Sequence, residues 1–284
     1  MKKALLASVA GIALIVAASA NAADLGARPT YKAPPLVAPV PIFTWTGCYI
    51  GGHIGGGWGR KDFSDIDPPP PPVHFFVGDG SGPETLRVNT SGFLGGGQIG
   101  CDYQFAPNWV IGIEGDFSGA DIKGSGVDPF FPTTGKTFHA KTDWLATATG
   151  WVGWAWDRLL IYIKGGAAWA HDKYDAFEPV ADELVDCISP APCTYNAAET
   201  RTGWTVGAGF EWAFWNNWSA KLEYDFYGFG NRDLSFPCTN GAGSCGLRGP
   251  VNIKQDINAV KFGINYRFNW GKAPIGKAPV VASY

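Results

Sequence analysis

Hydrophobic residues recur at every second position through long stretches of this 284-residue chain. From Trp218 to Phe226 the even positions are apolar or aromatic, and the odd positions are polar or charged. A period of two over ten or so residues is typical of a β-strand whose two faces meet different surroundings, because a helix repeats every 3.6 residues. Eight segments show the alternation: 45–60, 88–105, 109–121, 142–156, 159–174, 200–214, 218–230 and 254–268.

The connections between these segments alternate strictly between short and long. The short ones are 106–108, 157–158 and 215–217, and the long ones are 61–87, 122–141, 175–199 and 231–253. With an even number of strands, every long connection falls at one end of the sheet and every short turn at the other, as in bacterial outer-membrane barrels. The sequence therefore predicts an all-β fold, an eight-stranded antiparallel up-and-down transmembrane β-barrel over residues 45–268, with short periplasmic turns and four long surface loops.

The apolar face of such a barrel faces either lipid or, in a soluble lipocalin-like cup, the interior. Charged residues make up only 17% of the chain, against about 25% in a typical soluble domain. Trp144 and Trp154 are ten residues apart on one apolar face, and ten tilted residues rise ~25 Å, the height of a lipid-facing band. These features favour a barrel whose apolar face contacts lipid. We expect an aromatic girdle formed by Trp58, Trp109, Trp144, Trp154, Trp169, Trp204, Trp212, Trp218 and Phe268.

The polar face of the predicted strands collects acids and bases. Residues i and i+2 share a face about 6–7 Å apart in any sheet, so pairs such as Glu223 and Asp225 do not by themselves indicate acid–base catalysis. Because isolated charges are costly in a low dielectric, we interpret the set as a salt-bridge and water network that fills the lumen. A polar pathway for small solutes is the alternative. The expected lumen charge network is Asp102, Glu114, Asp116, Lys164, Glu211, Lys221, Glu223, Asp225, Lys261 and Arg267.

The four histidines do not indicate a catalytic centre. His53 is expected to face the lumen, His74 and His139 fall in long connections, and His171 falls near a strand end. No Ser or Cys lies at a spacing from them that suggests a catalytic triad. We therefore expect no enzyme activity, no catalytic residue, no metal site and no cofactor, although loop histidines leave a heme or metal ligand open.

The cysteines predict disulfides. The first two strands form a hairpin centred near residues 74–75, so the numbers of facing residues sum to about 149, which is the sum for Cys48 and Cys101. Both have the parity of the apolar face, so a cross-strand disulfide is expected near the short-turn end. Cys187 with Cys193, and Cys238 with Cys245, are local pairs without the spacing of a zinc site. Disulfides form in the oxidising compartments outside the cytoplasm, so pairing of these cysteines fits an exported chain.

The ends of the chain have separate roles. Residues 1–22 combine two lysines, a 15-residue apolar run and an A-x-A cleavage signal, which predicts a secretory signal peptide. Residues 23–44 are a proline-rich periplasmic lead, and residues 269–284 a flexible tail. The net charge of −3 argues against binding of nucleic acid, which requires a basic face.

Several motifs resemble one protein family. Trp45-Thr46-Gly47-Cys48-Tyr49-Ile50-Gly51-Gly52 resembles the opening "WTGFYVGGN" of the alpha-proteobacterial outer-membrane immunogenic proteins, and residues 92–100, GFLGGGQIG, resemble their second strand. Residues 156–162 resemble their central hairpin, and residues 265–268, NYRF, their closing strand. Thr149 and Trp151 stand where the family pattern has inward arginines, and Cys48 and Cys101 where it usually has aromatics.

The resemblance implies a small eight-stranded outer-membrane barrel of the porin family, with a structural envelope and surface-antigen role. Some members of the family are proposed to bind hemin or to form pores, so a narrow porin and a loop-based binding or adhesion module are the alternatives. The expected partners are outer-membrane lipid and lipopolysaccharide, the outer-membrane insertion machinery, and a host or small-molecule ligand at the loops.

Overall fold

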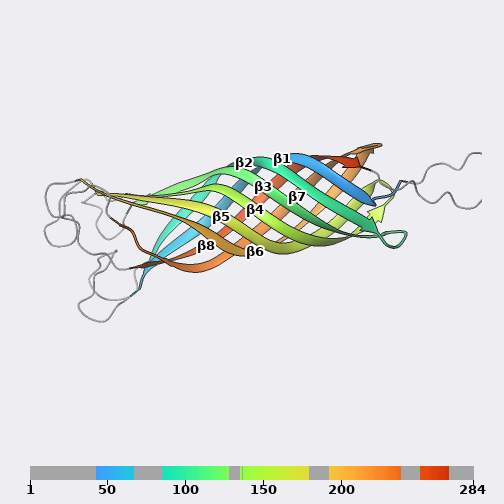
Figure 1. Ribbon diagram of the computed structural model, residues 1–284. Helices are drawn as coiled ribbons and strands as arrows, with labels where there is room; N and C mark the ends of the chain where they lie inside the picture. The colour runs from blue at the N-terminus through green and yellow to red at the C-terminus, as the bar shows by residue number, and fades with distance from the viewer. Residues whose placement is uncertain are drawn as a thin grey trace, which may run out of the picture. The chain divides into compact units, whose positions relative to one another are not determined.

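The computed structural model describes residues 43–66, 85–127, 135, 137–178, 192–237 and 250–268. Its strands are β1 (Gly47–Asp65), β2 (Thr85–Gln104), β3 (Trp109–Val127), β4 (Thr137–Trp156), β5 (Leu159–Glu178), β6 (Cys193–Trp215), β7 (Trp218–Leu234) and β8 (Val251–Phe268). Each pairs antiparallel with its sequence neighbours, and β1 also pairs with β8, so the sheet closes into a ring (Figure 1). The predicted eight-stranded up-and-down barrel is confirmed.

Some predicted segments lie outside the described residues: the signal peptide 1–22, all but the end of the lead 23–44, and the tail 269–284. Among the described residues, no helix is long and apolar enough to cross a membrane.

The β1–β2 hairpin has the predicted register. The numbers of facing residues sum to 149 along the whole ladder, and Cys48 and Cys101 form a disulfide. Cys48 also faces Phe268 of β8, so the cross-link lies beside the seam where the ring closes. Cys193 is disulfide-bonded as well, whereas three predicted disulfide cysteines lie outside the described residues, namely Cys187, Cys238 and Cys245.

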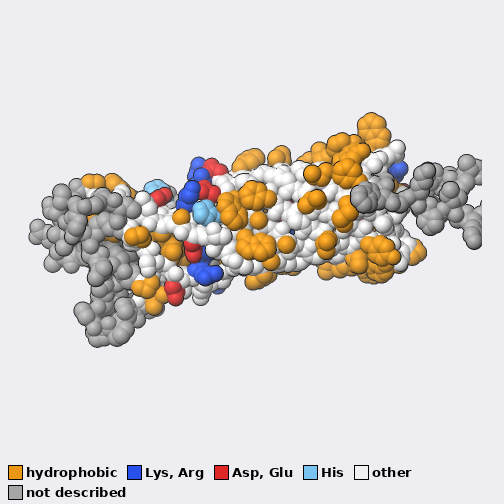
Figure 2. Space-filling model, in the orientation of Figure 1, with side chains coloured by type: hydrophobic (Ala, Val, Ile, Leu, Met, Phe, Trp, Pro, Cys, Tyr) orange, Lys and Arg blue, Asp and Glu red, His pale blue; other side chains and the backbone are white. Residues whose placement is uncertain are grey.

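The outer wall of the barrel is apolar over most of its length. Phe93, Ile99 and Ile113 have exposed fractions of 73%, 63% and 67%. On the described strands, no outward position between the two ends of this apolar band carries Lys, Arg, Asp or Glu. Figure 2 shows the resulting surface, on which hydrophobic side chains cover the wall and charges gather at one edge. Such a wall suits lipid and not water.

The pattern inverts toward the long connections. There Phe63 and Leu86 point inward and are 2% and 5% exposed, whereas the outward Asp62 and Arg87 form an ion pair of 2.7 Å. The strands therefore continue beyond the predicted segments, for example to Asp65 in β1 and back to Cys193 in β6. The predicted boundaries were too short because they followed an apolar outer face, and that face ends where the strands leave the lipid-facing band.

Three apolar layers cross the inside of the barrel. At the short-turn end, Trp45 packs with Trp151 and Leu160. A middle layer includes Leu94, Ile122, Leu145, Tyr227 and Ile257. At the long-connection end a third layer includes Phe63, Phe138, Tyr174, Tyr195, Phe236 and Ile253.

Glycine has different roles on the two faces of β2. A Cβ added at the inward Gly96 would lie 1.8 Å from the carbonyl oxygen of Phe117, because the inner face of β2 presses against the β3 backbone. A Cβ at the outward Gly97 would lie 3.4 Å from the oxygen of Gly51, an ordinary van der Waals contact. The narrow ring therefore requires glycine at residue 96 and leaves room at residue 97.

Replacing Gly96 by Ala should destabilise the barrel by about 1–3 kcal/mol, since the added methyl group overpacks against backbone that cannot move aside. Gly97→Ala, one residue along the same strand, is the matched control and should change the free energy of unfolding by less than about 0.5 kcal/mol. Urea-induced unfolding in phospholipid vesicles measures both. Equal effects at the two positions would contradict the assigned orientation of β2.

Candidate functional site: the charged interior of the barrel

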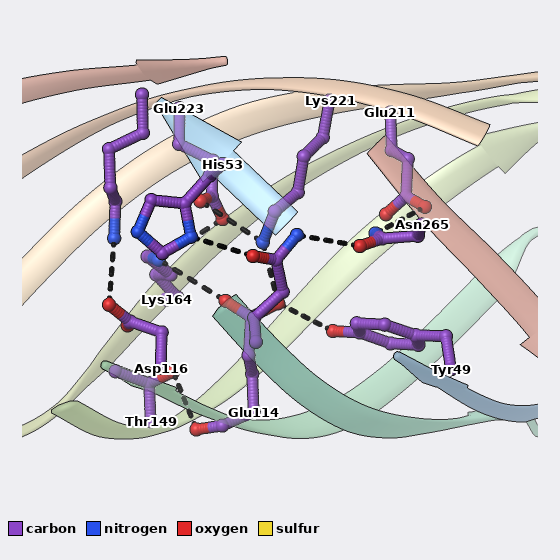
Figure 3. A network of polar contacts seen from close by, with 12 residues as sticks. Tyr49, His53, Glu114, Asp116, Thr149, Lys164, Glu211, Lys221, Glu223 and Asn265 are labelled. Atoms are coloured by element: carbon purple, nitrogen blue, oxygen red, sulfur yellow. Dashed lines mark hydrogen bonds and ion pairs between the residues drawn. The ribbon is translucent and has the colours of Figure 1, made fainter. Parts of the chain in front are cut away.

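Three lysines and four carboxylates meet in the middle of the lumen. Figure 3 shows Lys164, Lys221, Glu114, Asp116 and Glu223 of this cluster. Nζ of Lys221 lies 2.6 Å from Oε2 of Glu114 and 3.1 Å from Oε2 of Glu223. Nζ of Lys164 lies 3.0 Å from Oε1 of Glu223 and 3.2 Å from Oδ1 of Asp225. These side chains come from β3, β5 and β7 and meet because each occupies an inward position of its strand.

Lys261 of β8 extends this cluster toward the middle apolar layer. Its Nζ lies 2.8 Å from Oδ2 of Asp225 and 3.3 Å from Oδ1 of Asp116. The hydroxyl of Thr147 donates a hydrogen bond to Asp116. Each of the four central carboxylates thus contacts at least one lysine, as burial of charge requires.

Neutral side chains donate further hydrogen bonds to the cluster or lie beside it. The hydroxyl of Tyr49 donates to Glu114 and that of Tyr162 donates to Glu223, both at 2.7 Å. The ring of the buried His53 lies between Gln98 and Ser118, with contacts of 2.6 and 2.7 Å. His53 therefore faces the lumen as predicted.

A second ionic group closes the short-turn end. Arg267 reaches Asp102 at 2.5 Å and Glu211 at 2.8 Å, and its guanidinium lies 4.5 Å from the ring centre of Trp45. The indole of Trp45 donates to the backbone oxygen of Asp157 in the β4–β5 turn, at 3.0 Å. Trp45 was expected to begin the first strand; instead it precedes β1, is 1% exposed and spans the end of the lumen.

A third ionic group lies near the long-connection end, and the sequence analysis missed it. Nζ of Lys61 lies 2.6 Å from Oδ1 of Asp172, and Arg201 reaches Asp172 at 3.7 Å and Glu199 at 2.5 Å. Each of Lys61, Asp172 and Arg201 has the inward parity of its strand, so continuing the alternation past residue 60 would have found Lys61. Tyr174 adds a ring 4.7 Å from the Lys61 ammonium.

The structure places every residue of the expected lumen network inside the barrel. All ten have exposed fractions of 7% or less. The residues of the expected aromatic girdle lie on the outer wall, where Trp58 and Trp204 are 47% and 55% exposed. Thr149 and Trp151, which replace the arginines of the family pattern, point inward and are buried.

In the described interior the middle apolar layer separates the central cluster from the group around Lys61, whereas Tyr49 contacts both Arg267 and Glu114 and so joins the group at the short-turn end to the central cluster. Acids that resemble catalytic pairs in the sequence, such as Glu223 and Asp225, are buried and paired with lysines. Their chemistry is that of a packed ionic core.

Lys221→Met should destabilise the folded barrel by about 3–5 kcal/mol, because it leaves Glu114 and Glu223 buried with one cation fewer. The exposed Lys254 offers a matched control, and Lys254→Met should cost less than about 0.5 kcal/mol. Adding Glu114→Gln to Lys221→Met should recover part of the loss. The free energy of unfolding in vesicles tests all three, and a loss of similar size in both single variants would refute the ionic core.

Comparison with known proteins agrees with this architecture. Over residues 10–268 the chain matches the family described as "Outer membrane protein beta-barrel domain". The 31 kDa outer-membrane immunogenic protein of Brucella melitensis biotype 1 is 34% identical over 276 residues, which cover 94% of this chain and 100% of that protein. The 22 kDa outer membrane protein of Rhizobium leguminosarum bv. viciae is 29% identical over 235 residues, covering 81% and 82% of the two chains.

Likeness to solved structures is looser. The outer membrane protease OmpT of Escherichia coli is 9% identical, with 81% of this chain and 100% of that chain covered and a TM-score of 0.46. OprG of Pseudomonas aeruginosa is 14% identical, with 78% and 96% covered and a TM-score of 0.39. The family match, the Brucella relative and the apolar ring of eight strands lead to one conclusion: the chain belongs to the outer-membrane β-barrel domain family and is an integral protein of the bacterial outer membrane.

Proposed function

We propose that this protein is a closed structural barrel of the outer membrane that serves envelope integrity and surface display, with a lumen that does not conduct. The observation that carries the proposal is the stack of side chains inside the ring. Ionic groups around Arg267, Lys221 and Lys61 share the lumen with three apolar layers, one at each end and one between the central cluster and Lys61. Eight strands enclose a space just wide enough for side chains to fill.

The two ends of the stack support a closed lumen. At the periplasmic end Trp45 spans the opening and is held by Asp157 and Arg267. Toward the cell surface, Phe63, Phe138 and Tyr195 belong to one buried layer. A narrow porin would need a continuous polar path, and the apolar layers interrupt it.

A non-enzymatic role fits the same interior, since the buried acids are paired with cations and are remote from solvent. The surface-display role is supported by the relatives that are named outer-membrane immunogenic proteins. A binding or adhesion function for hemin or a host ligand would reside in the long connections, most of which lie outside the described residues.

The refolded protein should give no discrete current steps across a planar lipid bilayer. The variant Trp45→Ala should also be silent, because it removes only the periplasmic lid and leaves the other layers in place. Trp154→Ala, on the outer wall, is the matched control for loss of a large aromatic residue.

Insertion must be verified in the same preparation, by protease protection and by the heat-dependent shift in gel mobility of a folded barrel. Reproducible steps from the inserted wild type would overturn the closed lumen. Steps from Trp45→Ala alone would show instead that one residue gates an otherwise open channel.

A further inference from the structure

A row of ion pairs marks the upper edge of the lipid-facing wall on β3, β4 and β5. We call it the lysine ladder, and its members are Lys123, Asp121, Lys141, Asp143 and Lys173. Figure 2 shows a band of charged side chains beside the broad hydrophobic wall. Trp144 and His171, which face one another across β4 and β5, lie on the lipid side of the ladder with their rings stacked at 5.9 Å.

The three lysines of the ladder are direct cross-strand neighbours. Lys123 faces Lys141, and Lys141 faces Lys173. Like charges directly opposite one another destabilise a sheet, so sheet stability does not explain this row. A register shift between Thr142 and Trp144 places Asp143 in a bulge, and bulges commonly re-aim side chains beside functional sites.

Two carboxylates hold the lysines together without neutralising them. Lys123 lies 2.9 Å from Asp121, and Lys141 lies 3.4 Å from Asp121 and 3.1 Å from Asp143. Lys173 lies 2.6 Å from Asp143. Three positive and two negative charges leave one positive charge in excess.

The ladder remains charged and keeps donors available. Hydrogen bonds from Lys123 and Lys173 lower the pKa of Asp121 and Asp143 respectively, and Asp143 raises the pKa of Lys141. Side-chain exposed fractions of 66%, 45% and 55% for Lys123, Lys141 and Lys173 leave these groups open to the outside of the barrel. Each ammonium carries three N–H donors, and the four contacts to aspartate do not use them all.

We propose that the lysine ladder binds the phosphate groups of a phosphorylated glycolipid in the outer leaflet. The ladder lies where the wall passes from apolar to charged, which is the level of lipid headgroups. Lysine ammonium groups bind phosphate as point charges, and a row of three matches a headgroup that carries more than one phosphate. The inference rests on the outer-membrane location and is independent of whether the lumen conducts.

The test is binding of bisphosphorylated lipid A to the exported chain in detergent micelles, counted by native mass spectrometry. Replacing all three ladder lysines by Gln should weaken binding about 10-fold or more, since each basic residue near a membrane surface contributes to attraction of anionic lipid. The matched control combines Arg60→Gln, Arg232→Gln and Lys254→Gln, which removes three exposed positive charges from β1, β7 and β8. This control should change the affinity for lipid A by less than about 2-fold.

Further arms separate the possible ligands. Dephosphorylated lipid A should bind the wild-type protein as weakly as intact lipid A binds the ladder variant. Millimolar inorganic phosphate should not compete with intact lipid A for the wild-type protein. The pair Asp121→Asn and Asp143→Asn should retain or strengthen binding. Heat-dependent gel mobility confirms that every variant is folded.

Three results would overturn the proposal. Equal affinity in the ladder variant and its control would remove the ladder as the site. Full competition by inorganic phosphate would indicate a free-anion site. Loss of binding in the aspartate variant alone, restored by added Mg²⁺, would assign the site to a cation held by the carboxylates.

Discussion

The narrow interior of an eight-stranded ring is the constraint on which the rest of this structure depends. A lumen of this width has no room for bulk water, so each inward side chain must either pack against apolar neighbours or pair with an opposite charge. Both solutions occur here along the lumen. The same crowding explains Gly96, where the backbone of the next strand occupies the place of a side chain.

Much of the fold follows from the sequence, because one period of two describes every strand. The alternation placed all ten predicted charges inside the barrel and, with the hairpin symmetry, paired Cys48 with Cys101. It missed the group of Lys61, Asp172 and Arg201, although only Lys61 lies beyond its predicted segment. Asp172 and Arg201 fall on the inward face of the predicted segments 159–174 and 200–214. Beyond the apolar band the period of two continues, but inward positions include apolar residues such as Phe63, and outward positions include charged residues such as Asp62 and Arg87.

The sequence does not tell which residues pair with each buried charge. A strand pattern tells which face a residue occupies, whereas contacts across the lumen depend on the stagger of the closed ring. Lys61 meets Asp172 across 111 residues of sequence, and Tyr49 meets Glu114 across 65. The role of Trp45 could not be predicted for the same reason. Its position across the end of the lumen depends on the β4–β5 turn lying opposite the start of β1.

The inverted upper part of the barrel has a consequence for recognition from outside the cell. From Trp144 to Thr137 the wall continues for seven residues, a rise of about 18 Å beyond the lipid-facing band. This collar is hydrogen-bonded sheet whose exterior carries charged and polar side chains together with Val127 and Phe177. An antibody that bound this collar would recognise a conformational epitope on the strands themselves, which denaturation would destroy and which sequence changes in the long connections would leave in place.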